Sequence, residues 1–132
     1  EVQDGAKSNL ELLADAAALY REALRDGAFS PWTGKKKRVL DLHGMNAEVA
    51  QVSVFDALDQ IMQLPVDDPA WRKGLTIVFG RGKHSEGGMS VLGPAVQAMI
   101  KQDFKLNARV QHEHGGSLVV PARELRRIRG DW

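Results

Sequence analysis

Hydrophobic positions recur along this chain with two different periods. Spacings of three and four residues put apolar side chains on one face of a helix, and they predict helices at residues 8–26, 47–63 and 90–102. Short apolar runs bounded by glycine, proline and polar residues predict strands at residues 38–42, 75–79, 108–112 and 117–120. From residue 38 onward, the expected order is therefore β-α-β-α-β-β.

This order predicts the α/β fold class, as a two-layer α/β sandwich with an extra N-terminal helix. The run at 75–79 is almost entirely apolar, so we expect a strand that is covered on both faces. Residues 65–74 combine prolines with aspartates, so we expect a surface loop there. Gly115 and Gly116 predict a hairpin turn between the last two strands. Residues 123–129 form a short basic segment, either helical or irregular.

The first predicted helix has both of its ends marked. Ser8 followed by Glu11 has the spacing of a capping box, and Gly27 is expected to end the helix. One apolar stripe runs along it, made by Leu10, Leu13, Ala17, Tyr20 and Leu24. The stretch that follows has the composition of a linker. We therefore divide the chain into residues 1–34, an N-terminal helix and linker, and residues 35–132, the main domain.

The two later helices also have one apolar face each. Asn46 and Ser90 are expected to cap them. The expected buried residues are Ala50, Val54, Leu58, Ile61 and Met62 in the second helix and Leu92, Val96, Met99 and Ile100 in the third.

Composition narrows the class of protein. The 132 residues suit one domain with an appendage, and 43% hydrophobic with 27% charged residues is ordinary for a globular protein. No apolar run approaches the roughly 18–20 residues of a membrane span, so no membrane contact is expected. The chain has no cysteine, which excludes disulfides and thiolate metal sites. It does not begin with methionine, so we take it to be a piece of a longer protein, and we expect a monomer.

The net charge of +1 conceals an asymmetry along the chain. Residues 1–34 hold three basic and six acidic residues, whereas residues 35–132 hold 15 basic and 11 acidic ones. The positive excess weakly favours a polyanionic partner. Part of it lies in one run, Lys35, Lys36, Lys37 and Arg38. This run could bind phosphates, with a solvated surface as the equal alternative.

The first predicted strand ends in the sequence Leu-Asp-Leu-His-Gly at residues 40–44. Asp41 and His43 alternate on the strand, so both should point to the same face. A carboxylate beside an imidazole fixes its tautomer and raises its pKa toward working pH, which suits a general acid or base. The alternative is structural, with Asp41 binding backbone amides and His43 filling a turn.

A second candidate site follows the strand at 75–79. This glycine-rich stretch, residues 80–88, begins with Gly80, Arg81, Gly82, Lys83 and His84. Glycines let backbone N–H groups approach a phosphate, and the start of the next helix favours an anion. The glycine spacing matches neither a Walker A loop nor GxGxxG, so a flexible connector is the alternative.

Other side chains are weaker candidates. His112 and His114 alternate on a predicted strand, but no third ligand accompanies them, so we expect no metal site. Trp32 and Trp71 lie in the predicted linker and loop and could stack on bases. Aromatic residues in such places more often pack against a core.

The two motifs, in this order and each followed by a helix, resemble those of the Smr (small MutS-related) domain. The resemblance covers about residues 36–121 and rests on Leu-Asp-Leu-His-Gly and Gly-Arg-Gly-Lys. It implies a fold like the C-terminal domain of bacterial translation initiation factor three. The longer loop through Ser85, Gly88 and Ser90 is similar to Smr domains that end plant and algal pentatricopeptide-repeat proteins. The first helix resembles the tail of such a repeat tract.

The resemblance also implies nucleic-acid binding, often with endonuclease activity on RNA or DNA. Asp41 and His43 match the proposed catalytic motif, and Arg81 and Lys83 match the phosphate-binding loop. We therefore favour an RNA endonuclease in organellar RNA processing, in a plastid or mitochondrion, with His84 as the partner acid. A neighbouring 2′-OH as nucleophile needs no metal, whereas an attacking water favours Mg²⁺ near Asp41.

Two alternatives stay open. A binding module without chemistry would hold RNA or DNA on its basic face while an upstream repeat tract reads the sequence. A protein-interaction module would use residues 80–88 only as a flexible loop. That second alternative predicts no RNA binding even at low salt, where phosphate contacts are strongest.

Overall fold

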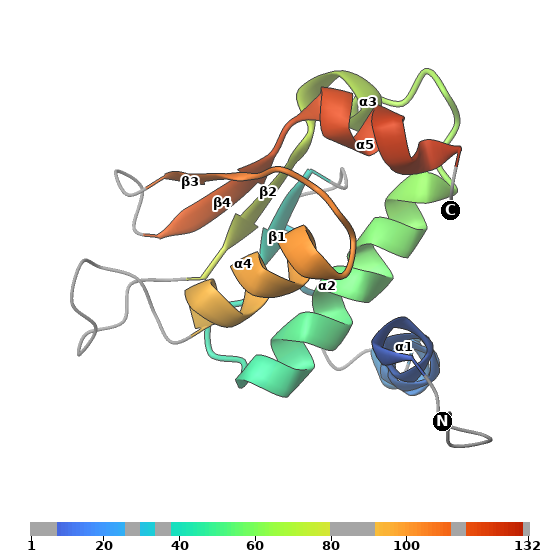
Figure 1. Cartoon of the computed structure of the whole chain (residues 1–132). Coiled ribbons are helices and arrows are strands. Elements are labelled where there is room, and N and C mark those ends of the chain that lie inside the picture. Colours follow the sequence, from blue (N-terminus) through green and yellow to red (C-terminus); the bar gives the residue numbers. More distant parts are fainter. Residues whose placement is uncertain (1–7, 26–29, 34–37, 80–91, 112–115, 131–132) are drawn as a thin grey trace, which may run out of the picture.

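The computed structural model of the chain describes residues 8–25, 30–33, 38–79, 92–111 and 116–130. Its centre is a four-stranded sheet with the order β1-β2-β4-β3 (Figure 1). The strands are β1 (Val39–Asp41), β2 (Leu75–Val78), β3 (Arg109–Gln111) and β4 (Ser117–Val120). β1 is parallel to β2, and the other two neighbouring pairs are antiparallel. The four strands predicted from the sequence are thus confirmed, with small shifts at their ends.

Five helices accompany this sheet in the described residues: α1 (Asn9–Arg25), α2 (Ala47–Met62), α3 (Ala70–Lys73), α4 (Leu92–Gln102) and α5 (Ala122–Arg129). α2 and α4 lie side by side against one face of the sheet, and α1 packs on α2 (Figure 1). α3 and α5 lie together beyond one end of the strands. The α/β class and the sandwich with an extra N-terminal helix are therefore confirmed.

The two faces of the sheet have different surroundings. Leu40, Ile77 and Leu118 lie opposite one another in register, and all three are buried in the core that α2 and α4 share. Thr76 and Val78 point to the other face, because side chains alternate along a strand, and they are only half-buried. The prediction that the strand at 75–79 is covered on both faces is therefore wrong. In the described part of the chain, α2 and α4 both pack on the same face.

The helix faces predicted from residue spacing are those that the core buries. The predicted residues of α4, which are Leu92, Val96, Met99 and Ile100, are all buried. In α2, Met62 is half-buried and the other predicted residues are buried. Helical spacing alone was sufficient here because each helix turns one stripe toward the sheet.

α1 begins where the sequence predicts. The Ser8 N–H donates to Glu11 Oε1 at 2.8 Å, and the Glu11 N–H donates to Ser8 Oγ at 3.1 Å. These reciprocal bonds complete a capping box. Leu13 and Ala17 of the predicted stripe are buried, whereas Leu10 is 38% exposed. The apolar stripe of α1 is therefore covered only in part.

Polar contacts dock the second half of α1 on α2. Arg21 Nη2 lies 2.5 Å from Asp56 Oδ1 and 3.2 Å from Asp59 Oδ2, and the Tyr20 hydroxyl donates to Ser53 Oγ at 3.0 Å. Asp56 is buried, so its pairing with Arg21 offsets the cost of removing its charge from water. The hydrogen bond to Asp56 raises the pKa of Arg21, and burial raises the pKa of Tyr20. These contacts fix the direction of α1 on the domain.

The stretch at 65–74 is not the surface loop that the sequence predicted throughout. It contains α3, and Asp68 Oδ1, just before this helix, accepts from the Ala70 N–H at 2.9 Å. Trp71, within this helix, is only 2% exposed. A helix of four residues is too short to show a 3.6-residue hydrophobic period, which is why the sequence pattern missed it.

The junction of α3 with β2 is pressed against the junction of β4 with α5. Gly74 has φ of +81°, and a Cβ placed on it would lie 2.4 Å from Val120 O. Only glycine fits such a close approach. Leu125 and Ile128 of α5 are buried. The basic segment at 123–129 is therefore a packed helix rather than an irregular tail.

Candidate nucleic-acid interface

Parallel pairing of β1 and β2 brings their last residues together. Asp41 lies opposite Val78, and the Leu42 N–H donates to Val78 O at 2.8 Å. α2 and α4 begin at the same end of these strands (Figure 1). We call this place the carboxyl end of the sheet. Residues 42–46 leave β1 here, and the chain leaves β2 for the glycine-rich stretch from the neighbouring position.

Side chains hold the turn at residues 42–46 in place. Asp41 Oδ1 accepts from the His43 N–H at 2.9 Å. Gly44 has φ of +85°, and no atom of the described residues lies within 4 Å of a Cβ placed on it. Asn46 Oδ1 accepts from the Val49 N–H at 2.8 Å, which caps α2 as the sequence predicts. The turn is thus fixed from within, while no described residue fills the space beside Gly44.

His43 does not lie on the strand, contrary to the prediction. β1 ends at Asp41, and His43 follows in the turn with its side chain exposed. The hydrogen bond of Asp41 goes to the His43 backbone, which is the contact that the structural alternative expects. Asp41 Oδ2 has no hydrogen-bond partner among the described residues, so one carboxylate oxygen is not used by the turn.

Arg38 lies at the opposite end of β1 from Asp41. Its carbonyl accepts from the Thr76 N–H at 2.8 Å, and its side chain is half-buried. Three residues of strand separate Arg38 from Asp41, or about 10 Å. The other predicted site residues lie outside the described residues: Lys35, Lys36, Lys37, Gly80, Arg81, Gly82, Lys83 and His84. The same holds for His112 and His114.

The predicted linker contributes a contact that sequence reasoning missed. Trp32 forms an isolated antiparallel bridge with Leu40, and the Asp41 N–H donates to Pro31 O at 2.8 Å. The backbone of Asp41 is therefore held on the outer side of β1 as well. Trp32 is half-buried, packed on the core. Trp71 is buried, so the suggestion that it stacks on bases is wrong.

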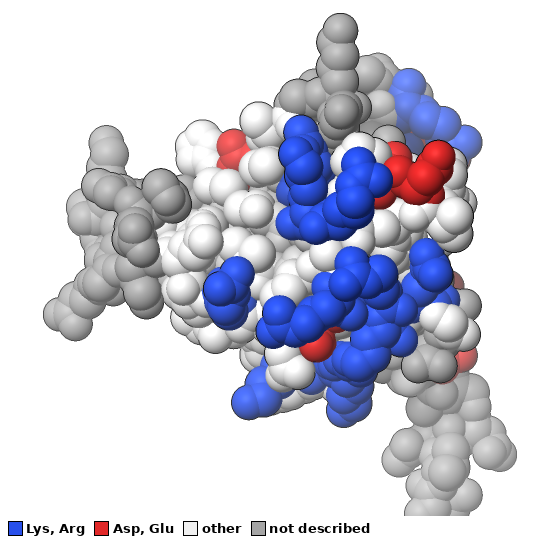
Figure 2. Space-filling view, turned by 90° about the horizontal axis from the view of Figure 1, so that it is seen from above, with Lys and Arg blue, Asp and Glu red and all other residues white. Residues whose placement is uncertain are grey.

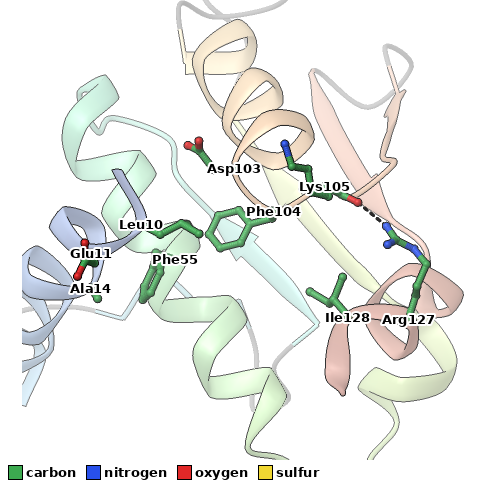
Figure 3. A pocket seen from close by; sticks show the side chains of 9 residues that line it. All are labelled: Leu10, Glu11, Ala14, Phe55, Asp103, Phe104, Lys105, Arg127 and Ile128. Carbon is green, nitrogen blue, oxygen red and sulfur yellow. Dashed lines mark hydrogen bonds between the residues drawn. The ribbon is translucent and has the colours of Figure 1, made fainter. Parts of the chain in front are cut away.

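A pocket of about 540 Å³ lies away from the carboxyl end, between α1, α2, α5 and the connection that follows α4 (Figure 3). Its apolar wall includes Phe55, Phe104 and Ile128, and Lys105 and Arg127 stand on its rim. None of the described residues that line it is a predicted site residue. We therefore do not place the candidate site in this pocket.

The comparison with known families bears on both motifs. A model of the Smr domain matches residues 40–122, which is more than half of the chain. The chain belongs to the Smr domain family. The match begins in β1, just before Asp41, and spans both candidate motifs. Membership of the family suggests nucleic-acid binding or nuclease activity.

No curated protein and no solved structure matches the chain. Among the described residues, no helix is long and apolar enough to cross a membrane. The described residues also contain no group of three or more His, Asp or Glu side chains placed to hold a metal ion.

Proposed function

We propose that this Smr domain is an endonuclease acting on RNA, with its site at the carboxyl end of the sheet. One observation carries the proposal: Asp41 ends β1 directly beside the end of β2, after which the glycine-rich stretch begins, and its carboxylate holds the turn that contains His43. The starts of α2 and α4 face the same place, and helix starts favour anions such as phosphate.

The roles follow from the chemistry of each group. The exposed imidazole of His43 is the general base or acid, because it can reach a phosphate or hydroxyl bound in the open space beside Gly44. Asp41 orients the turn through Oδ1 and leaves Oδ2 for proton transfer or, if water is the nucleophile, for Mg²⁺. His84 is the partner acid. Lys83, Arg81 and backbone N–H groups would stabilise the charge that develops on the phosphate.

A binding module without chemistry is the second candidate. It is favoured by the hydrogen bond from His43 N–H to Asp41 Oδ1, because this bond gives the carboxylate a structural task. In that case the domain would hold RNA or DNA while an upstream pentatricopeptide-repeat tract, ending in α1, selects the sequence. For either function, we propose that the protein acts in a plastid or mitochondrion.

Cleavage of a labelled single-stranded RNA, with and without EDTA, tests the proposal. We expect His43→Ala to slow cleavage by about 10²–10⁴-fold, the usual contribution of a general acid or base. Asp41→Asn keeps an acceptor for the His43 N–H but removes the carboxylate. A similar loss with Asp41→Asn would therefore assign chemistry, and not only turn geometry, to Asp41.

Asp67→Ala is the matched control, since Asp67 is an exposed acid in the α2–α3 connection. It should cleave like the parent. Binding of RNA without cleavage by the parent would refute the nuclease and favour the binding module. Full activity in EDTA would rule out the metal route and agree with attack by the 2′-OH, whereas activity restored only by Mg²⁺ would favour water as the nucleophile.

A further inference from the structure

A second concentration of positive charge lies at the other end of the sheet. α3 ends in Arg72 and Lys73, and α5 has Arg123, Arg126, Arg127 and Arg129 against one acid, Glu124. Figure 2 looks onto this end and shows Lys and Arg side chains over much of the surface, with few acidic ones. We call these six basic residues, together with the exposed Lys105, the α3–α5 basic surface.

The partners of these arginines leave most of their charge uncompensated. Arg126 Nη1 donates to the backbone carbonyl of Trp71 at 2.5 Å, and the Arg129 guanidinium carbon lies 5.0 Å from the centre of the Trp71 ring. A carbonyl and an indole orient a guanidinium without cancelling its charge. Arg127 differs, since its guanidinium lies 2.8 Å from Glu124 Oε1. Trp71 therefore positions two positive charges by means of neutral groups.

The two helices that carry the basic surface, α3 and α5, are packed firmly against each other and the core. The close approach of Gly74 to Val120 O fixes α3 against α5, and buried Leu125 and Ile128 anchor α5 to the core. Arg127 also donates to the Lys105 carbonyl across the pocket rim (Figure 3). The guanidinium groups of Arg126, Arg127 and Arg129 already have partners in the fold. These side chains therefore lose less freedom on binding a ligand than side chains without such contacts.

The position of this surface suits a strand that continues past the candidate site. α3 and α5 lie beyond the starts of β1 and β2, whereas residues 42–46 lie beyond their ends (Figure 1). The two places are therefore separated by at least the length of β2, whose four residues span about 10 Å. A stacked nucleic-acid strand covers that distance in about three nucleotides, at roughly 3.4 Å each. The same strand can therefore contact both ends of the sheet.

We propose that the α3–α5 basic surface binds the phosphate backbone of the nucleic acid whose neighbouring segment lies at the carboxyl end. The identity of the ligand, a nucleic acid, rests on the proposed function. The location of the binding surface does not, because it follows from the basic residues of α3 and α5. The surface offers cationic side chains and no exposed aromatic platform among its described residues. It should therefore bind backbone phosphate without reading the sequence.

The salt dependence of RNA binding tests the inference, with Lys73→Gln/Arg123→Gln as the variant. Both side chains are exposed, and neither side chain makes a hydrogen bond with the described residues, so the variant should fold. Arg25→Glu is the control: it changes the net charge by the same two units, in the last turn of α1. All measurements use a His43→Ala background and a fluorescein-labelled oligouridylate, so that the RNA stays intact.

We expect the variant to bind RNA more weakly than the parent. Its salt dependence should also be shallower: two lost phosphate contacts reduce the slope of log K against log salt by about 1.4. The ratio of the parent's binding constant to that of the variant then falls about sevenfold between roughly 50 and 200 mM salt. Arg25→Glu should keep the parent slope. Thermal unfolding followed by circular dichroism checks that all variants are folded.

Equal slopes for the variant and Arg25→Glu would overturn the inference. So would a parent that binds no RNA at low salt, an outcome that would refute the proposed function as well. If the variant lost the parent's binding to phosphatidylserine vesicles but kept the parent's salt slope for RNA, the surface would be assigned to membranes. That result would also overturn the inference. If Lys73→Gln/Arg123→Gln shows the expected slope change, but the domain with His43 intact never cleaves RNA in the separate cleavage assay, this inference stands and only the nuclease is refuted.

Discussion

The two ends of the β1–β2 pair share one backbone feature, a glycine with positive φ, but differ in how tightly that glycine is packed. Each has a glycine in the left-handed region, Gly44 with φ of +85° and Gly74 with φ of +81°. A Cβ on Gly44 would meet no described residue within 4 Å, whereas one on Gly74 would lie 2.4 Å from Val120 O. Among the described residues, one end has free space beside its glycine, and the other is closed by packing. A positive φ alone therefore does not distinguish a site from a structural joint; the space around it does.

Gly74→Ala should have the largest effect on stability. The left-handed backbone costs a side chain about 1–2 kcal/mol, and forcing a methyl into a filled space adds about 1–3 kcal/mol. We expect a loss of about 2–5 kcal/mol in the free energy of unfolding, measured by urea denaturation. A loss below about 1 kcal/mol would mean that the α3–α5 end is loosely packed, and the contrast between the two ends would fail.

Gly44→Ala should cost only the backbone strain, about 1–2 kcal/mol, because there is room for the methyl group. Urea denaturation beside Gly74→Ala gives the comparison directly. The distinction between an open and a closed end predicts a clear gap between the two variants. If Gly44→Ala is as damaging as Gly74→Ala, the turn at residues 42–46 is a packed joint rather than an open site.

Glu124→Gln should have the smallest effect, and one that depends on pH. The hydrogen bond with Arg127, followed by that from the Asn107 N–H, holds the pKa of Glu124 below its ordinary value. The ionised form therefore stabilises the fold above the ordinary value of 4.5, and this contribution is lost as pH falls through the lower folded value. Because Arg127 is about half exposed, we expect about 0.2–1 kcal/mol.

Urea midpoints of the parent and of Glu124→Gln check this sign. The parent should be the more stable at neutral pH, and the two should converge in acid. A difference that persists or grows in acid would show that Glu124 does not stabilise α5 through its charge.

Local chemistry made much of the fold predictable. The capping box of Ser8 and Glu11, the Asn46 cap and the buried face of α4 each depend on residues close together in sequence. Asp41 and His43 were chosen as candidates from their spacing near a strand end; His43 lies in the turn instead, and their role stays a prediction. Their placement beside β2 needed only the rule that parallel strands end together. The family resemblance added the chemistry that spacing could not decide.

What the sequence did not reveal depends on distant partners. α3 exists because Trp71 is buried against α5, far along the chain. Thr76 and Val78 belong to an apolar run, yet they are half-buried because α2 and α4 cover the other face. The bridge from Trp32 to Leu40 lies in a segment with the composition of a linker. None of these has a local periodicity from which it could be predicted.

Single-turnover cleavage of one labelled RNA over a range of protein concentrations tests most directly that the two ends have different tasks. The account predicts that His43→Ala lowers the maximal rate about 10²–10⁴-fold with little change in half-saturation. Lys73→Gln/Arg123→Gln should instead raise the half-saturating concentration and leave the maximal rate near that of the parent. The opposite assignment, or equal effects of both changes on both constants, would contradict it.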